Sequence, residues 1–277
     1  MTLRAGKLAA KALQTKGASM KGSGEEGRKA SGIGERFHEE TKYHPDRMGG
    51  HTLDWDTMPK RYKDYPSPLA TTTLPRPQAG PPVDVWGVFG RRRSTRDFAP
   101  ARTLPLGLLS ALLWATQAIT AEAQGWHFRA APSAGGLYPI ETYLFVRAVE
   151  GLQQGIYHFR PHKFDLEFIK RGDIAAHLAE AALGQEMIRE AQATFIWTAV
   201  VARSKWKYRQ RAYRYIYMDV GHIAQNLYLA GTAAGLGVCS VGAFFDDQVN
   251  GLIDVDGVGE TTLYLACVGW PTTEEAG

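Results

Sequence analysis

The run Phe195-Ile196-Trp197-Thr198-Ala199-Val200-Val201 restricts the possible folds of this chain most, because nearly every residue in it is apolar. A strand with one face in water alternates apolar and polar side chains, whereas a strand buried on both faces is apolar almost throughout. The run therefore predicts a central strand in a sheet that is covered on both faces. A chain of 277 residues, of which 44% are hydrophobic, is large enough to build that cover.

Apolar periodicity and turn residues predict further strands and helices around this strand. Strands are expected at residues 140–149, 155–159, 164–170, 238–243 and 261–268. Helices are expected at residues 83–90, after a cap at Thr103 with Pro105 in the first turn, from a cap at Asp173 to residue 183, and at residues 185–191 and 211–234. Helices interleave with strands without strict alternation, which predicts an α+β fold with a mixed sheet sandwiched by helices.

The chain divides into a main domain and less regular flanking segments. Residues 1–36 carry eight Lys or Arg against three Glu and few large apolar side chains, so we expect a disordered basic tail. Residues 3–13 could instead form a short basic amphipathic helix of the transit-peptide or membrane-touching kind. Residues 37–82 are expected to form an irregular extension that ends in a Pro-rich linker. The main domain is expected at residues 83–271, followed by a tail at 272–277.

Charge and cysteine content exclude several classes of protein. The first 36 residues carry a net charge of +5 against +4 for the whole chain, so the remainder is close to neutral, which weakens the case for a nucleic-acid binder. No apolar run is long enough to span a membrane. The two cysteines, Cys239 and Cys267, stand alone in apolar segments, which predicts a reducing, cytoplasmic setting and no disulfide. His38, His44 and His51 lack a common register, so no metal site is expected.

The segment Arg91-Arg92-Arg93-Ser94-Thr95-Arg96-Asp97 predicts an anion site. Arg presents a planar fork of donors that matches phosphate oxygens two at a time, which Lys cannot do. Four guanidiniums and two hydroxyls in one turn could anchor a phosphate dianion. A solvated basic loop or a nucleic-acid patch would have the same composition. We expect Asp97 to brace the loop by pairing with one of the arginines.

Two further motifs follow in a fixed order. Pro132-Ser133-Ala134-Gly135-Gly136-Leu137-Tyr138-Pro139-Ile140-Glu141 contains adjacent glycines, which allow positive φ and close approach of the backbone to a flat ligand. Residues 219–237 form a helix rich in small residues that ends in Gly235-Leu236-Gly237. In this order, the three motifs resemble the nitroreductase superfamily of flavin enzymes, and more narrowly its SagB-type dehydrogenases. The resemblance covers residues 83–271 and, more weakly, residues 37–43.

The resemblance implies an FMN-dependent homodimer with the flavin at the subunit interface. The phosphate would be held by Arg92, Arg93, Ser94 and Arg96. The flavin ring or ribityl chain would lie against Pro132, Ser133, Ala134, Gly135 and Gly136, and near Gly237 and Val238. SagB-type enzymes oxidise thiazolines and oxazolines in ribosomally made peptides, which suggests a peptide substrate and a cyclodehydratase partner. Two departures are that no cation follows Gly269-Trp270-Pro271, and that Gly-Gly replaces the flavin-facing Asn of classical nitroreductases.

The same resemblance assigns a catalytic pair to Lys207 and Tyr208. Oxidation of an azoline moves a hydride to the flavin and a proton to a base within hydrogen-bond reach. Five other Lys or Arg lie between residues 203 and 214, and crowding by cations favours a neutral lysine. A solvated basic helix start is the simpler interpretation of this segment. An NAD(P)H-dependent nitro or quinone reductase, or a non-catalytic module that binds an anionic polymer, remain alternatives for the whole chain.

Overall fold

The computed structural model describes residues 32–47, 52–77 and 83–272, in two units that divide after Tyr43. In the first unit, helix α1 (Ile33–Glu40) is closed at its C-terminus by the Thr41 amide, which donates to the Phe37 carbonyl. We expected disorder up to residue 36 and irregular structure after it. Residues 33–40 instead form helix α1, on which Arg36 and Glu40 pair one turn apart at 3.9 Å. The candidate helix at residues 3–13 and His51 lie outside the described residues.

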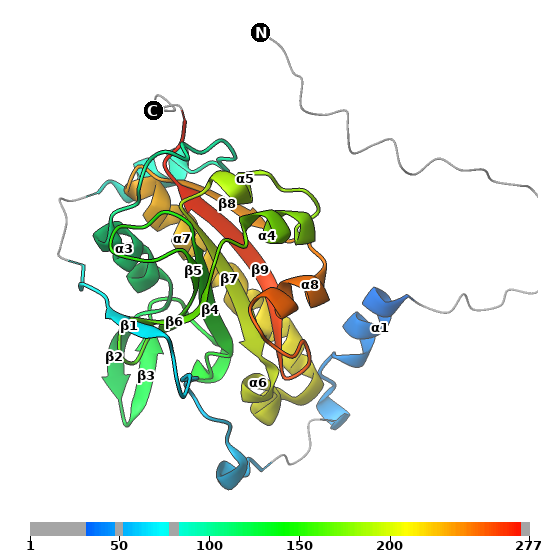
Figure 1. Cartoon of the computed structure of the whole chain (residues 1–277). Coiled ribbons are helices and arrows are strands. Elements are labelled where there is room, and N and C mark those ends of the chain that lie inside the picture. Colours follow the sequence, from blue (N-terminus) through cyan, green and yellow to red (C-terminus); the bar gives the residue numbers. More distant parts are fainter. Residues whose placement is uncertain (1–31, 48–51, 78–82, 273–277) are drawn as a thin grey trace, which may run out of the picture. The chain divides into compact units, whose positions relative to one another are not determined.

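The second unit is built on a seven-stranded sheet. Its strands, in spatial order, are β1 (Ala70–Thr73), β6 (Asp165–Arg171), β5 (Gly155–Arg160), β4 (Ile140–Val146), β7 (Ala193–Val200), β9 (Glu260–Gly269) and β8 (Gly237–Val241). Strand β7 pairs with β4 on one side and β9 on the other, so the apolar run at 195–201 does contribute a central strand. Figure 1 shows this sheet between helices.

We expected a mixed sheet, and each pairing in the sheet is antiparallel. Strands β4, β5 and β6 follow one another as hairpins, which requires antiparallel neighbours. Strands β7 and β8 are joined through helices and run in the same direction. They do not pair, because β9 inserts between them and pairs antiparallel with both.

Seven helices accompany the sheet in the described part of the second unit: α2 (Val85–Arg91), α3 (Leu106–Gln117), α4 (Ala175–Ala181), α5 (Met187–Glu190), α6 (Val201–Tyr208), α7 (Ala212–Ala233) and α8 (Asp246–Leu252). Asp84 caps α2 by accepting from the Trp86 and Gly87 amides. Asp173 accepts from the Ala175 amide before α4, as its sequence position suggests. Thr103 does not cap α3, because that helix begins after Pro105.

Each face of the sheet packs against its own helices. Along β4, Leu144 and Val146 belong to the core shared with α3 and α7, whereas Tyr143 and Phe145 point into the core shared with α4, α5 and α8. This alternation is the period of two that strand geometry imposes. Both faces are therefore buried, which confirms the predicted α+β layers. None of the helices in the described ranges is long and apolar enough to cross a bilayer.

Several elements have no clear sequence signal. Strand β1 has the sequence Ala-Thr-Thr-Thr and lies largely exposed at the edge of the sheet, where it pairs with β6. It belongs to the segment 37–82, which we expected to be irregular. A separate hairpin joins β2 (Ile119–Ala123) to β3 (Trp126–Arg129), and two short 3₁₀ turns lie at Pro45–Arg47 and Trp55–Thr57. These elements form because tertiary partners supply hydrogen bonds that local propensity does not predict.

Candidate active site

The arginine loop, residues 92–96, leaves the C-terminal end of α2. The Arg93 guanidinium donates to the carbonyl oxygens of Gly90 and Arg92, at 2.9 and 2.8 Å. The Arg92 guanidinium lies 5.3 Å from the centre of the Tyr228 ring. Within the described ranges, no carboxylate pairs with an arginine of this loop, so Asp97 does not brace it as expected. Instead, the Asp97 carbonyl accepts from the Thr272 amide.

The arginine loop is held against the start of β8. The Thr95 amide donates to the Val238 carbonyl at 3.0 Å. A Cβ atom on Gly237 would lie 2.7 Å from Thr95 Cγ2, so glycine is required for this approach. The Ser94 hydroxyl lies 3.1 Å from the Tyr228 hydroxyl, which also accepts from the Ser240 amide. The structure thus brings together the predicted phosphate residues and the predicted flavin neighbours Gly237 and Val238.

The glycine turn, residues 132–136, is braced by a buried carboxylate. Gly135 and Gly136 have φ of 64° and 65°, in the region that favours glycine. The Ser133 hydroxyl donates to Asp219 Oδ2 at 2.6 Å, and the Ala134 amide donates to Oδ1 at 3.1 Å. Burial raises the pKa of Asp219, although these two hydrogen bonds oppose the shift. Ser133 therefore fixes the turn onto α7, and a flavin contact by its hydroxyl stays a prediction.

Lys207 and Tyr208 end α6 beside the glycine turn. A Cβ atom on Gly135 would lie 2.5 Å from the Tyr208 hydroxyl and 3.1 Å from Lys207 Nζ. The Tyr208 ring meets the Tyr215 ring edge-on at 4.7 Å, and burial raises the pKa of the Tyr208 phenol. Residues more than 70 positions apart in the sequence thus form one cluster. No carboxylate of the described residues pairs with Lys207.

Helix α6 is anchored by Arg203, one turn before Lys207. Its guanidinium is buried and lies 2.6 Å from Glu141 Oε1 on β4. It also donates to the Tyr138 carbonyl at 3.3 Å and to the Lys60 carbonyl at 2.8 Å. Arg203 therefore connects α6 with the end of the glycine turn and with the N-terminal extension. Sequence reasoning counted this residue only as a neighbouring charge.

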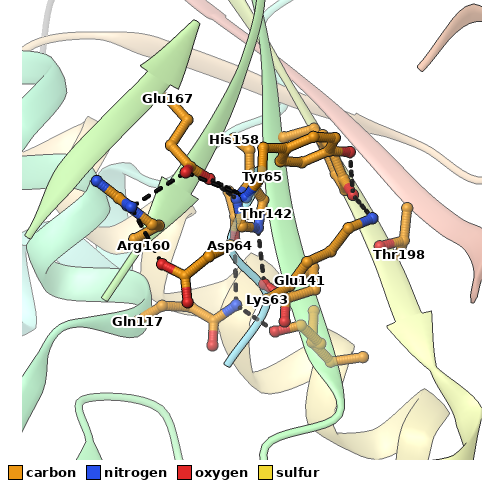
Figure 2. Close-up of polar contacts among 12 residues, drawn as sticks. Lys63, Asp64, Tyr65, Gln117, Glu141, Thr142, His158, Arg160, Glu167 and Thr198 are labelled. Carbon is orange, nitrogen blue, oxygen red and sulfur yellow. Dashed lines mark hydrogen bonds and ion pairs between the residues drawn. The ribbon is translucent and has the colours of Figure 1, made fainter. Parts of the chain in front are cut away.

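A buried charge network continues from Glu141 along the neighbouring strands. His158 lies between Glu141 Oε2 and Glu167 Oε2, at 2.9 and 3.0 Å, and Figure 2 shows the three side chains in line. Burial lowers the pKa of His158, but hydrogen bonds to both carboxylates outweigh it and raise the pKa. Burial opposes ionisation of Glu141, yet Arg203 and His158 lower its pKa to about 2.

The sequence does contain a signal for this network. His158 and Arg160 lie two positions apart on β5, and Asp165 and Glu167 lie two positions apart on β6, which puts them on one face. Arg160 contacts both acids, at 2.7 and 3.0 Å. Charged side chains at alternate positions of otherwise apolar strands indicate a buried ion-pair cluster, which our sequence analysis missed.

The strap, residues 54–65, ties the N-terminal extension to this network. Lys63 Nζ lies 2.6 Å from Glu260 Oε2 and from the Tyr143 hydroxyl, and Asp64 pairs with Arg160 at 3.0 Å. The Trp206 indole N–H donates to the Asp54 carbonyl at 2.8 Å. The extension therefore includes a structured wall beside α6, although the sequence predicted it as irregular.

Residues 90–270 match the model of the nitroreductase family. The chain belongs to the nitroreductase family. Its sequence is 38% identical to MJ1384 of Methanocaldococcus jannaschii, which carries a nitroreductase name, over 66% of this chain and 88% of that protein. The structure of a nitroreductase from Anabaena variabilis is similar, with a TM-score of 0.73 and 30% sequence identity, over 88% of this chain and 47% of that one.

Two further relatives are named as peptide-processing proteins. Identity is 30% with the trifolitoxin-processing protein TfxB of Rhizobium leguminosarum, over 53% of this chain and 41% of TfxB. The sequence identity with the microcin B17-processing protein McbC of Escherichia coli is 28%, over 53% of this chain and 56% of McbC. This nitroreductase-family member therefore spans about half of those two proteins. The likeness agrees with the SagB-type branch that the sequence motifs indicate.

Proposed function

We propose that this nitroreductase-family protein is an FMN-dependent dehydrogenase that oxidises peptide azolines to azoles. The observation that supports it most is the convergence of Lys207 and Tyr208 on the positive-φ Gly135. This convergence puts a potential base and a phenol beside a turn whose backbone can approach a flat ring. The peptide-processing relatives TfxB and McbC support a peptide as the substrate.

The residues present fit FMN. In the arginine loop, Arg93 and Arg96 are exposed and Arg92 is partly exposed, no described carboxylate pairs with them, and guanidinium forks match phosphate oxygens. Arg92, Arg93, Ser94 and Arg96 would hold the phosphate. Gly237 and Val238 lie beside that loop, and Gly135 and Gly136 would face the ring. When bound, FMN supplies a two-electron acceptor for the hydride that leaves the azoline.

The chain itself supplies the base and its placement. Lys207 Nζ would accept the proton from the ring carbon next to the one that loses hydride, and the Tyr208 hydroxyl, which lies on the same side of Gly135, would orient the azoline. Arg203 positions both residues by fixing α6 to Glu141. The buried Asp219 keeps the glycine turn in register with them. Positioned proton transfer of this kind contributes about 10²–10⁴-fold to rate.

A homodimer is part of the proposal. Helix α2 packs on α7, and both carry exposed apolar side chains: Trp86 is 79% exposed, and Phe89, Tyr217 and Met218 are about half exposed. Apolar surface of this extent favours a subunit contact next to the arginine loop. The proposal also includes a cyclodehydratase as partner. It includes a cytoplasmic location as well, which agrees with the two free cysteines.

The alternative is an NAD(P)H-dependent nitro or quinone reductase, which the name of MJ1384 favours. The experiment that separates the two is stopped-flow spectroscopy of the flavin-loaded protein with NADH, NADPH or a thiazoline peptide. An azoline dehydrogenase should bleach its flavin with the thiazoline and leave both nicotinamides unreacted. Rapid bleaching by a nicotinamide alone would support the reductase instead. A protein that neither contains nor takes up FMN would exclude both.

Replacing Arg92 with alanine should weaken FMN binding about 10- to 100-fold, because a charge-assisted hydrogen bond contributes about 1.5–3 kcal/mol. Ser94→Ala should have a smaller effect, since its hydroxyl also contacts Tyr228. Fluorescence titration of the flavin-free proteins measures both constants. Arg189→Ala is the matched control, because Arg189 is a partly exposed arginine on α5 that pairs with Glu186. Equal affinity in all four proteins would remove the phosphate assignment.

Gly135→Ala should lower turnover more than Gly151→Ala does. Both glycines have positive φ, so both substitutions carry a similar backbone strain of about 1 kcal/mol. Only at Gly135 would the new methyl group meet Tyr208 and Lys207, whereas nothing lies within 4 Å of a Cβ at Gly151. Rates with a thiazoline peptide, compared at equal folded fraction in urea titrations, measure the difference. Equal losses would show that the contact with Gly135 is irrelevant to turnover.

A further inference from the structure

A partly enclosed pocket lies next to the glycine turn, on the side of Gly136. The strap supplies Arg61 and Tyr62, and strand β3 supplies Trp126, His127 and Arg129. The last residue of the glycine turn, Gly136, and the two residues after it complete the lining. Two of these residues are arginines and none is an acid. The pocket is therefore positively charged and has aromatic walls, one residue away from the glycine that touches Lys207 and Tyr208.

Arg129 is an unusual residue at the base of this pocket. Its side chain is 7% exposed, and one amino group donates to Gln117 Oε1 at 2.8 Å. Its Nε is buried without a hydrogen-bond partner, and no carboxylate of the described residues lies within 4 Å of the guanidinium. Glu141 is nearby but already contacts Arg203 and His158. Buried cations are ordinarily paired, because an unpaired one loses its hydration without replacement.

Aromatic rings orient Arg129 and Arg61, and neither guanidinium forms a direct ion pair with a carboxylate of the described residues, although Glu141 lies near enough to favour the charged form of Arg129. The Arg129 guanidinium lies 4.8 Å from the centre of the Tyr138 ring. Burial lowers its pKa to about 10, which leaves it charged at neutral pH. Arg61 stacks 3.9 Å from the Trp126 ring and donates to the Gly125 carbonyl. Stacked guanidiniums keep edge N–H groups that can bind an anion in their plane.

We propose that this pocket binds a carboxylate of the substrate peptide, held by Arg129 and Arg61 between the rings of Tyr62, Trp126 and Tyr138. That the carboxylate belongs to a substrate rests on the proposed function, whereas the preference for an anion rests on the residues of the pocket alone. The carboxylate belongs either to an acidic side chain near the azoline or to the peptide C-terminus. Its position beside Gly136 would set which ring of a peptide reaches Lys207.

Binding of acetate to the flavin-loaded protein tests the pocket without turnover. Isothermal titration should give at least tenfold tighter binding of acetate than of acetamide, which has about the same size and no charge. Arg129→Gln should remove that preference, and Arg189→Gln should keep it. Where Arg129→Gln does not fold, Arg61→Gln at the partly exposed rim should weaken acetate binding severalfold. Equal binding of acetate and acetamide, or unchanged preference in the variants, would overturn the proposal.

A second set of probes identifies the source of the carboxylate. Four thiazoline peptides are compared: the residue beside the ring is Glu or Gln, and the C-terminus is an acid or an amide. Either the Glu peptide should exceed the Gln peptide in kcat/KM by tenfold or more, or the C-terminal acid should exceed the amide by that factor. The difference should vanish in Arg61→Gln. No difference in either comparison, with turnover present, would overturn the substrate role. Selective acetate binding without any thiazoline oxidation would instead support the anion site and remove the proposed function.

Discussion

Replacing Lys207 with alanine is expected to slow thiazoline oxidation by about 10²–10⁴-fold, because a positioned base contributes that much to proton transfer. The FMN content should stay the same, since the arginine loop that would hold the phosphate is formed by other residues. Lys207 lies close to where a Cβ of Gly135 would be, so its loss removes a group from the site without removing a buried core residue. Single-turnover kinetics of flavin bleaching measure the effect directly.

Two further variants separate a base from a mere positive charge. Lys207→Arg keeps the charge but has a far higher pKa, so it should be nearly as slow as the alanine variant. Lys205→Ala removes an exposed lysine from the same helix and should turn over normally. Wild-type rates in Lys207→Ala would remove the catalytic role. A wild-type oxidation rate in Lys207→Arg would show that Lys207 contributes only its positive charge.

Replacing Glu141 with alanine is expected to lower the free energy of unfolding by about 3–5 kcal/mol, which is typical when one partner of a buried ion pair is removed. Arg203 and His158 would keep their buried positions and lose the carboxylate between them. Urea denaturation monitored by tryptophan fluorescence measures the loss. Glu150→Ala, at an exposed position after β4, is the control and should change stability by less than about 0.5 kcal/mol.

The pH dependence of stability gives an independent readout of the same variant. The pKa of Glu141 falls from 4.5 to about 2 in the folded protein. A lowered carboxyl pKa stabilises above the unfolded value, and this contribution is lost as the pH falls from 4.5 towards 2. The wild type should lose about 3 kcal/mol from this group over that interval, and Glu141→Ala should not. If the free energy of unfolding fell equally between pH 4.5 and 2 in both proteins, the buried ion pair of Glu141 would be contradicted.

Local sequence patterns predicted much of the framework. The apolar run at 195–201 specified a central strand, and the small-residue helix at 211–234 appears as α7 at 212–233. The arginine loop and the glycine turn were recognisable because their chemistry lies within a few consecutive residues. Such signals are short-ranged: periodicity, capping and backbone freedom act between neighbours in the chain. The Thr103 cap was wrong because α3 begins at Leu106, directly after Pro105, which occupies the N-cap position without a side-chain cap.

Tertiary structure alone decided which of these segments meet. The approach of Gly135 to Tyr208, and of Thr95 to Gly237, joins segments that no local pattern connects. The pairing of His158 with Glu141 and Glu167 depends on the register of three strands. Strand β1 and the strap are held by partners on β6, β9 and α6 rather than by their own propensity. Sequence therefore specified the chemical groups, and long-range packing specified their distances, because contact energies depend on neighbours in space rather than along the chain.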